Sequence, residues 1–253
     1  MENKPEKPIG HKIIRLDQTT STNTLIMDTP EYLDNHGLVI VADHQTAGKG
    51  RIGRKWASIP GAQLQFSVVV HPTLPKEQIP VMSLLVGVVV AETLEEKLGL
   101  KPTLKWPNDV LLDGRKVCGI LLELKTLRPK EPLLAIGIGL NCLGSPEDFP
   151  PELQDILTTL QANTLAQVDR EEILTSLLAR METEYQELVE GGKAALLERW
   201  RARANFSNQQ VRFPTSKGPQ VGVVEGVSED GFLLVKTDEG EGWALSSGEL
   251  EWL

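Results

Sequence analysis

A short stretch of the chain, AGKGRIGRKW at residues 47–56, concentrates glycine and positive charge. Four of the seven residues from Lys49 to Lys55 are cationic. Arginine and lysine side chains bind phosphate and carboxylate groups, and glycines let such an anion approach the backbone closely. The stretch therefore predicts a loop that holds an anion. The alternative is a solvated basic loop without a ligand.

The spacing of Gly48, Gly50 and Gly53 matches the dinucleotide-binding fingerprint G-x-G-x-x-G. That fingerprint needs a helix directly after the loop, so that the helix N-terminus faces the pyrophosphate. Here the chain reaches Pro60-Gly61 within eight residues of Gly53, which leaves no room for such a helix. A Walker P-loop is also excluded, because no Gly-Lys-Ser/Thr follows the last glycine. The anion is therefore expected to be of another kind.

Apolar segments on either side of this loop predict two buried strands, at residues 37–45 and 64–70. Upstream, a short strand leads into a polar turn and then a helix. Ser21 or Thr22 is expected to cap that helix, because a hydroxyl can accept from the free N–H groups of the first turn. Residues 79–99 predict a helix that is apolar first and amphipathic later.

The middle of the chain predicts further strands. We expect a short strand at residues 103–106, a hairpin over residues 109–125 that turns at Asp113-Gly114, and a buried strand at residues 132–141. Residues 142–163 contain three prolines and predict a long loop. Loops of this length in a compact domain often act as lids over a site.

The last quarter of the chain divides into helices and then short strands. Helices are expected at residues 169–191 and from 193 to about 205, and the four or five short strands that follow predict a small SH3-like barrel. The predicted organisation is a disordered N-terminus at 1–10, a main domain at 11–206 and the barrel domain at 207–253.

Composition narrows the possible partners and location. The net charge is −9 and the pI is near 5.1, so nucleic-acid binding would need a dense basic surface beyond the one loop. About a dozen residues precede the first strand, too few for a helix-turn-helix, and no DNA partner is expected. No membrane-spanning run or signal peptide is evident, and the two cysteines, Cys118 and Cys142, are too few for a disulfide framework. A cytoplasmic protein is predicted.

Four motifs together resemble the biotin–protein ligase family. They are LKWPNDVLLDGRKVCGILLE at 104–123, STN at 21–23, QTAGKGRIGRKW at 45–56 and GIGLN at 137–141, in the family's order and spacing. The resemblance runs from about residue 12 to the end of the chain. It implies an α+β fold in which helices flank a mixed central β-sheet of the class II synthetase type, with a C-terminal SH3-like barrel. It also implies the monofunctional type, without an N-terminal DNA-binding domain.

The resemblance implies a reaction in two halves. The biotin carboxylate attacks the α-phosphate of ATP with Mg²⁺ present, which gives biotinyl-5′-AMP and pyrophosphate. A lysine of a biotin carboxyl carrier domain of a carboxylase then attacks the mixed anhydride and releases AMP. Relatives can dimerise, so a homodimer is a further expectation. One departure is Lys49, which stands where the family usually has arginine and lacks the planar fork.

The same resemblance implies the site residues. Arg51 would bridge carboxylate and phosphate, Lys116 would lie at their junction, Lys105 would face the phosphates, and Asp109 would hold Mg²⁺ or accept a proton from the acceptor lysine. Biotin would contact Ser21, Thr22, Asn23, Gln45, Gly48, Lys49, Gly50, Arg51, Lys116, Gly119, Leu121 and Gly137. ATP would contact Arg51, Arg54, Trp56, Lys105, Asn108, Lys116 and Asn141.

Each of these assignments has a plainer structural alternative. The STN motif at residues 21–23 can be only a helix cap, Lys116 only a surface-turn lysine, and Gly119 and Leu121 only core positions of a strand. At the level of function the alternatives are a lipoate–protein ligase, which has related chemistry, and a non-catalytic ligand-binding module. The retention of four charges at the expected reacting centre, Arg51, Lys105, Asp109 and Lys116, favours an enzyme.

Overall fold

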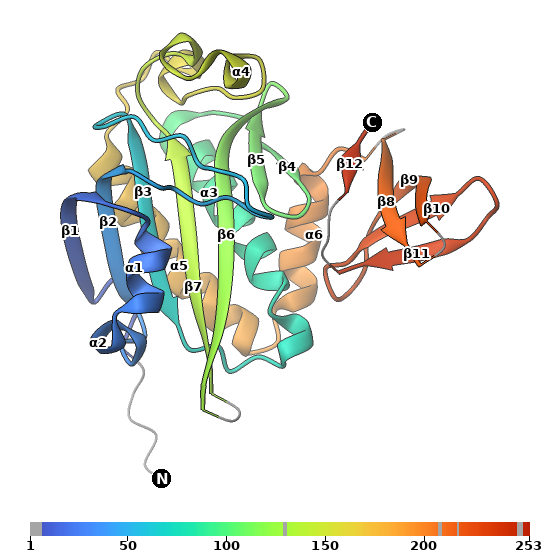
Figure 1. Ribbon diagram of the computed structural model, residues 1–253, viewed down its shortest axis with the longest axis horizontal. Helices are drawn as coiled ribbons and strands as arrows, with labels where there is room; N and C mark the ends of the chain where they lie inside the picture. The colour runs from blue at the N-terminus through green and yellow to red at the C-terminus, as the bar shows by residue number, and fades with distance from the viewer. Residues whose placement is uncertain (1–6, 129–130, 207–208, 217, 247–249) are drawn as a thin grey trace.

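The chain folds into a seven-stranded mixed sheet packed between helices, followed by a five-stranded antiparallel sheet (Figure 1). The computed structural model describes residues 7–128, 131–206, 209–216, 218–246 and 250–253. This arrangement confirms the predicted fold class, a mixed central sheet with flanking helices and a small C-terminal β-domain.

The large sheet has the strand order β1-β2-β3-β7-β6-β5-β4. Only the β1–β2 pair is parallel, and every other pairing in this sheet is antiparallel. The strands confirm the predicted β segments: β1 (Lys12–Thr19), β2 (Leu38–Gln45), β3 (Gln63–Val70), β4 (Thr103–Lys105), β5 (Asp109–Leu112), β6 (Arg115–Arg128) and β7 (Glu131–Asn141).

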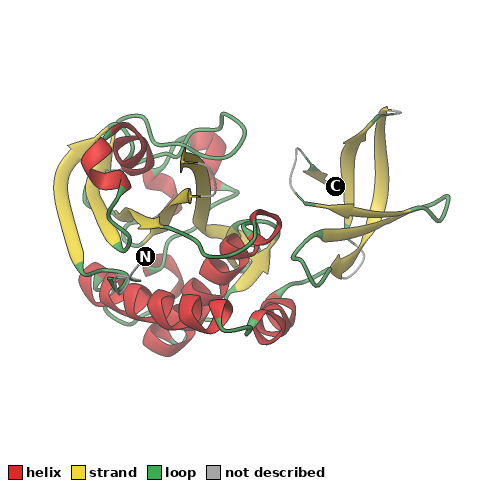
Figure 2. Ribbon diagram, turned by 90° about the horizontal axis from the view of Figure 1, so that it is seen from below, coloured by secondary structure: helices red, strands yellow, loops and turns green. Residues whose placement is uncertain are grey.

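Helices cover the two faces of the sheet unequally (Figure 2). The front face in Figure 1 carries the short helices α1 (Thr22–Asp28) and α2 (Pro30–Leu33). The back face carries α3 (Val81–Leu98) and α5 (Arg170–Val189), with α6 (Lys193–Arg203) beside α3. The first three turns of α3 are buried on all sides, because this helix lies between the sheet and the other two back helices. The front face is left open for a ligand.

The hairpin between β5 and β6 turns where the sequence predicts. Asp113 and Gly114 have φ values of 47° and 76°, the two positive angles that a type I′ turn requires. The turn brings Asp109 on β5 opposite Gly119 on β6, and Leu111 opposite Lys116. A local turn preference therefore places Asp109 and Lys116 on neighbouring strands.

The segment at residues 142–163 is more ordered than the predicted long loop. It contains the helix α4 (Pro151–Gln154) and two 3₁₀ turns (Pro146–Asp148 and Gln161–Asn163). Its backbone pairs with β6, where Lys116 N donates to Ile156 O at 2.9 Å and Lys116 O accepts from Thr158 N at 2.9 Å. Part of this order comes from tertiary contacts with β6, which the sequence of the segment does not reveal.

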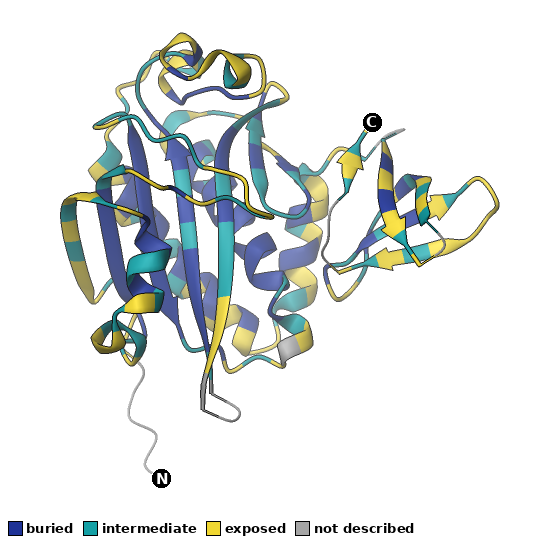
Figure 3. Ribbon diagram, in the orientation of Figure 1, coloured by how far each residue is buried: buried dark blue, intermediate teal, exposed yellow. Residues whose placement is uncertain are grey.

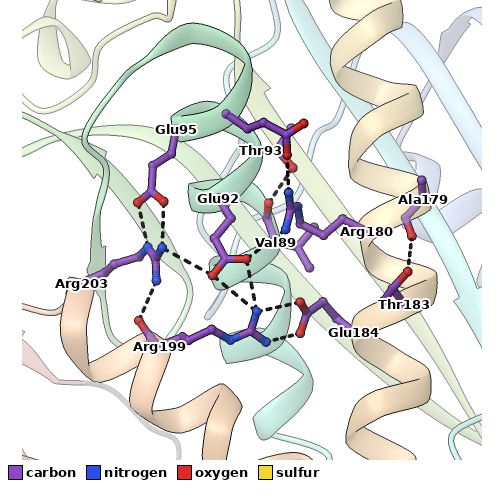
Figure 4. Close-up of polar contacts among 11 residues, drawn as sticks. Val89, Glu92, Thr93, Glu95, Ala179, Arg180, Thr183, Glu184, Arg199 and Arg203 are labelled. Atoms are coloured by element: carbon purple, nitrogen blue, oxygen red, sulfur yellow. Dashed lines mark hydrogen bonds and ion pairs between the residues drawn. The ribbon is translucent and has the colours of Figure 1, made fainter.

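An ion-pair network joins the three back helices (Figure 4). Arg199 of α6 binds Glu184 of α5 and also lies 3.2 Å from Glu92 of α3. Arg180 of α5 reaches the same Glu92 at 3.1 Å, and Arg203 of α6 binds Glu95 of α3 at 2.7 Å. The network fixes α6, which leads into the C-terminal sheet, against the main domain.

The C-terminal sheet has the order β11-β10-β9-β8-β12 and confirms the predicted run of short strands. The boundary predicted at residue 207 lies outside the described residues. The strands are β8 (Gln210–Thr215), β9 (Gly218–Val227), β10 (Leu233–Thr237), β11 (Gly242–Leu245) and β12 (Glu251–Trp252).

The predicted disordered N-terminus lies only partly within the described chain. Residues 1–6 are outside it, but Ile9 is buried and its N–H donates to Glu182 Oε2 at 2.8 Å. The folded chain therefore includes Ile9, which the predicted boundary at residue 11 leaves out. Within the described ranges, no helix has the length and apolarity to span a membrane.

Candidate active site

A cavity of about 1000 Å³ opens on the front face of the sheet. Its floor includes Gly119 and Leu121 of β6 and Gly137 and Gly139 of β7, which are half-buried, and Figure 3 shows half-buried positions along both strands. Every predicted site residue except Gly48 lines it, and the set comprises Ser21, Thr22, Asn23, Gln45, Lys49, Gly50, Arg51, Arg54, Trp56, Lys105, Asn108, Asp109, Lys116, Gly119, Leu121, Gly137 and Asn141. Residues from distant parts of the sequence thus share one site.

One end of the cavity is lined by a buried polar cluster at the start of α1. Ser67 Oγ of β3 lies 2.6 Å from both Thr22 Oγ1 and Asn23 Oδ1. Gln45 Oε1 accepts from Thr22 N at 2.8 Å. Ser21 occupies the N-cap position but makes no side-chain cap bond, so the predicted hydroxyl cap is wrong and Gln45 caps the helix instead. The cluster can offer donors and acceptors to a polar ring.

Glycines on β6 and β7 let side chains of other elements pack closely against the floor of the cavity. A Cβ on Gly137 would lie 2.7 Å from Asn23 Oδ1, so the room that the sequence predicts there is already used by Asn23. A Cβ on Gly139 would lie 2.5 Å from Trp56 Cζ2. Gly139 is absent from the predicted site, although its spacing of two from Gly137 places both glycines on the same face of the strand.

The glycine loop itself is a tight hairpin. Gly50 N donates to Arg54 O at 2.7 Å, and Trp56 N donates to Gly48 O at 2.9 Å. A Cβ on Gly48 would lie 2.8 Å from Trp56 O, so this glycine permits the close backbone approach and does not line the cavity. The next element after the loop is strand β3 and not a helix, as expected for a loop that is not a dinucleotide-binding fingerprint.

Arg51 and Arg54 of the loop line the other end of the cavity together with Lys105 and Lys116. Arg51 Nη1 donates to Asn108 Oδ1 at 3.3 Å, and Asn108 Nδ2 donates to Ile120 O at 2.8 Å. Lys116 Nζ pairs with Asp109 Oδ1 at 2.7 Å. Asn108 therefore holds the Arg51 guanidinium in place, and Asp109 holds the Lys116 ammonium.

Burial and mutual repulsion act on these cations. Burial lowers the pKa of Arg51, and Asp109 only partly offsets the effect. Burial also lowers the pKa of Lys105, with Lys116 and Arg54 adding repulsion and Asp109 opposing it. One carboxylate thus faces four positive groups, Arg51, Arg54, Lys105 and Lys116. Such an excess of positive charge suits a polyanionic ligand.

One predicted ligand contact, Asn141, has internal partners in the structure. Asn141 Oδ1 accepts from Gln63 Nε2 at 2.8 Å, and its Nδ2 donates to Thr158 O at 3.0 Å. Asn141 therefore anchors the segment at residues 142–163 to β7. Trp56, by contrast, has a buried Nε1 without a hydrogen-bond partner among the described residues.

The two cysteines are free and lie buried in the core. Burial raises the pKa of the Cys118 thiol far above its usual range and that of Cys142 to about 12. Both side chains are neutral at physiological pH and therefore weak nucleophiles. This agrees with their prediction as small buried residues.

Two walls of the cavity are absent from the prediction. The segment at residues 142–163 supplies Phe149, Leu153, Asp155, Ile156 and Leu157. The C-terminal sheet supplies Arg212, Phe213, Pro214, Pro219, Leu250, Glu251 and Trp252. The sequence predicts the first segment only as a loop of the kind that covers a site and gives no signal for the second, because the place of these residues depends on how the two segments dock against the main domain.

Comparison with known proteins identifies the family. Residues 15–141 match the biotin/lipoate A/B protein ligase family, and residues 206–251 match the biotin protein ligase C-terminal domain. The chain therefore belongs to the biotin protein ligase family, which confirms the resemblance seen in the motifs.

Individual relatives are similar over most of their length. The bifunctional ligase/repressor BirA of Bacillus subtilis is 33% identical, over 92% of this chain and 70% of that protein. The biotin–[acetyl-CoA-carboxylase] ligase of Mycobacterium tuberculosis is 32% identical, over 92% of this chain and 86% of that protein. The structure of the biotin protein ligase from Aquifex aeolicus in complex with biotin and ATP aligns with a TM-score of 0.81 and 31% identity, covering 96% of this chain and 99% of that one.

Proposed function

We propose that the protein activates biotin with ATP to form biotinyl-5′-AMP and transfers the biotin to a lysine of a biotin carboxyl carrier domain of a carboxylase. The protein is an ATP-dependent ligase of the biotin protein ligase family. The observation that carries the proposal is one cavity with two unlike ends, a slot with a buried polar cluster and a pocket with four cations. One site can therefore hold an uncharged ring and a triphosphate side by side.

The slot suits the biotin ring system. Glycines on its floor let the Asn23 amide and the Trp56 ring pack close to the strands, and Leu121 provides an apolar wall. Thr22 and Asn23 supply hydroxyl and amide groups that can pair with a ureido group, which has both donors and acceptors, and the buried Ser67 hydroxyl orients both side chains. Lipoate has no ureido ring, so this cluster favours biotin over lipoate.

The first half-reaction brings two anions together. Arg51, held by Asn108, would bridge the biotin carboxylate and the α-phosphate. Lys116 would neutralise charge at the bond that forms, and Lys105 would bind the phosphates that leave as pyrophosphate. Orientation of both reactants in one cavity supplies on the order of 7–11 kcal/mol in favourable intramolecular models, and fixed cations lower the barrier further.

Magnesium would be held at Asp109. Mg²⁺ in nucleotide sites takes one or two carboxylates and fills its remaining positions with phosphate oxygens and water. The described chain has no group of three or more His, Cys, Asp or Glu side chains that could hold a metal by themselves. Asp109 fits this requirement, because its carboxylate pairs with Lys116 and also acts on Arg51 and Lys105 in the cavity. Bound Mg²⁺ would neutralise phosphate charge.

In the second half-reaction the acceptor lysine must lose a proton before its amine attacks the acyl carbon. Asp109 would accept that proton, while Lys116 and Arg51 stabilise the AMP that departs. The residue assignments, including those of Arg54 and Trp56 to the nucleotide, rest on the geometry of the cavity and the family's motifs.

The test is pyrophosphate release by the purified protein with ATP, Mg²⁺ and either biotin or lipoate. The proposal expects release that depends on biotin, followed by transfer of biotin to a purified biotin carboxyl carrier domain. Release with lipoate alone would assign the protein to the other branch of the family. No release with either acid, while biotin still binds, would indicate a binding module.

Three sequence-based expectations stand beside the reaction. The acidic chain supports a protein without a DNA partner, a homodimer is expected from the family, and a cytoplasmic location from the two cysteines, which are too few for a disulfide framework. Sedimentation of the protein with and without biotin and ATP tests the dimer, and titration with duplex DNA tests the first expectation.

A further inference from the structure

The C-terminal sheet contacts the main domain at two adjacent residues of the KWPND motif. Trp106 Nε1 donates to Gly231 O, in the turn between β9 and β10, at 3.0 Å. Lys105 Nζ lies 5.1 Å from the centroid of the Trp252 ring on β12. Consecutive residues of one motif therefore touch two different parts of the same small sheet.

Pairing with β8 fixes the position of Trp252. Trp252 pairs with Val211, and Leu253 N donates to Gln210 O at 3.0 Å. The neighbouring Glu251 forms an ion pair with Arg212 across the same strands. The last three residues of the chain are thus held as a strand at the edge of the sheet, and the indole of Trp252 lines the cavity.

Helix α6 also holds the C-terminal sheet in place. Arg201 of α6 donates to Val227 O at 2.8 Å, and Lys193 pairs with Asp230 at 2.9 Å. Helix α6 is in turn tied to α3 and α5 by the ion-pair network (Figure 4). The distance between Trp252 and Lys105 is therefore set by folded structure on both sides.

Repulsion from neighbouring cations means that Lys105 needs a favourable contact to stay in the cavity. A lysine side chain is flexible, and here it is partly buried among other cations, with Asp109 already paired to Lys116. Repulsion would turn the ammonium out to solvent. The face of a tryptophan ring attracts an ammonium group, and the attraction is strongest where water is excluded.

We propose that Trp252 is a positioning residue for ATP. Its ring holds the Lys105 ammonium in the phosphate end of the cavity, and the C-terminal sheet thereby completes the ATP half of the site. The inference rests on the proposed function. It gives the C-terminal sheet a role in nucleotide binding and leaves the biotin slot, which is built from the main domain alone, unaffected.

The test compares three variants in biotin-dependent pyrophosphate release. Trp252→Leu removes the ring face, Trp252→Phe keeps a weaker one, and Leu253→Ala changes an exposed neighbour that does not line the cavity. We expect Trp252→Leu to raise the KM for ATP roughly three- to tenfold, in line with the strength of a partly desolvated cation–π contact. The KM for biotin should not change, Trp252→Phe should recover most of the loss, and Leu253→Ala should match the wild type.

Two binding measurements separate positioning from folding. Calorimetric titration with ATP should show the same loss of affinity for Trp252→Leu at an unchanged thermal midpoint. ATP should also quench tryptophan fluorescence in the wild type more than in Trp252→Phe, because the phosphates act on the Lys105 ammonium beside the ring. The second measurement needs only the conservative variant, so it holds even if Trp252→Leu does not fold.

The outcomes distinguish the inference from the function on which it rests. A wild type without biotin-dependent release contradicts the proposed function. An active wild type with an unchanged KM for ATP in Trp252→Leu, or with equal increases in both KM values, overturns the positioning role. Equal quenching in wild type and Trp252→Phe overturns it as well.

Discussion

At the scale of single residues, the proposed reaction depends most on the pair of Lys116 and Asp109. The ammonium and carboxylate lie 2.7 Å apart, and their side chains are only 33% and 26% exposed. Charge that is already oriented in a partly dry site stabilises a transition state without the cost of reorganising water. A lysine in this position is more than a turn residue.

We therefore expect Lys116→Met to lower kcat for biotin-dependent pyrophosphate release by about 10²- to 10³-fold, the usual loss when one fixed electrostatic group is removed. Lys125→Met is a matched control, because Lys125 lies on the same strand but bonds to Met27 O outside the cavity. Equal activity of the two variants in single-turnover assays would show that Lys116 has no part in adenylation.

Lys105 gives a prediction about pH. Burial lowers the pKa of this lysine below its ordinary value, so the free enzyme loses the proton at a lower pH than an exposed lysine would. A charged Lys105 is needed to bind phosphate, and kcat/KM for ATP should fall as the pH rises through this lowered pKa. The alkaline limb should therefore begin below the range of ordinary lysines.

Lys105→Arg supplies the comparison, because arginine keeps its charge throughout this range. The variant is expected to move the alkaline limb of kcat/KM for ATP to higher pH, whatever its absolute rate. Profiles measured with the same buffers should differ only on the alkaline side. If the two limbs coincide, another group controls the loss of activity.

At the scale of elements, the shape of the biotin slot depends on the glycines of β7, because side chains from other elements pack against the strand where these glycines have none. Gly139→Ala would place a methyl group 2.5 Å from the Trp56 ring, so that the indole or the strand must shift. We expect overpacking to lower the free energy of unfolding by about 1–3 kcal/mol and to displace the indole. Urea unfolding measures the first effect and the KM values for biotin and ATP the second.

The control for this substitution is Gly242→Ala. Gly242 also lies on a strand, but an added Cβ there meets no atom within 4 Å. Its free energy of unfolding should stay within about 0.5 kcal/mol of the wild type. Equal stability and equal KM values for the two variants would mean that Trp56 moves aside without cost.

The elements themselves are largely predictable from the sequence. The turn at Asp113-Gly114 and the helix end at Gly99 depend on local backbone angles, and both are where the sequence indicates. The cap of α1 is not, because Gln45 reaches it from a separate strand. The same limit applies to the site: motifs identify the glycine loop and Lys116, whereas Trp252 enters the cavity only through the packing of a second sheet.

At the scale of the whole molecule, the cavity lies where three parts of the chain meet. The sheet supplies its floor, the segment at residues 142–163 one wall, and the C-terminal sheet another. Because the cations of the site repel one another, their arrangement needs a rigid frame around them. The ion-pair network behind the sheet provides part of that frame by fixing α6, from which the C-terminal sheet extends.

The network predicts a global effect for one distant residue. Arg199 is the partner that the described structure gives to Glu184, whose side chain is 7% exposed. Arg199→Met would leave that carboxylate buried without a counter-charge, a change that costs 3–5 kcal/mol in a fully buried pair; with Arg199 itself one-third exposed, we expect a loss of about 2 kcal/mol in the free energy of unfolding.

Arg15→Met is the reference for this loss. Arg15 also pairs with a glutamate, Glu171, but both side chains are at least half exposed, and such pairs contribute less than about 1 kcal/mol. Urea unfolding of both variants at low and high salt should show a large, salt-insensitive loss for Arg199→Met and a small, screened loss for Arg15→Met. Similar losses would mean that solvent reaches Glu184 freely, and that apolar packing alone holds α6 and the C-terminal sheet in place.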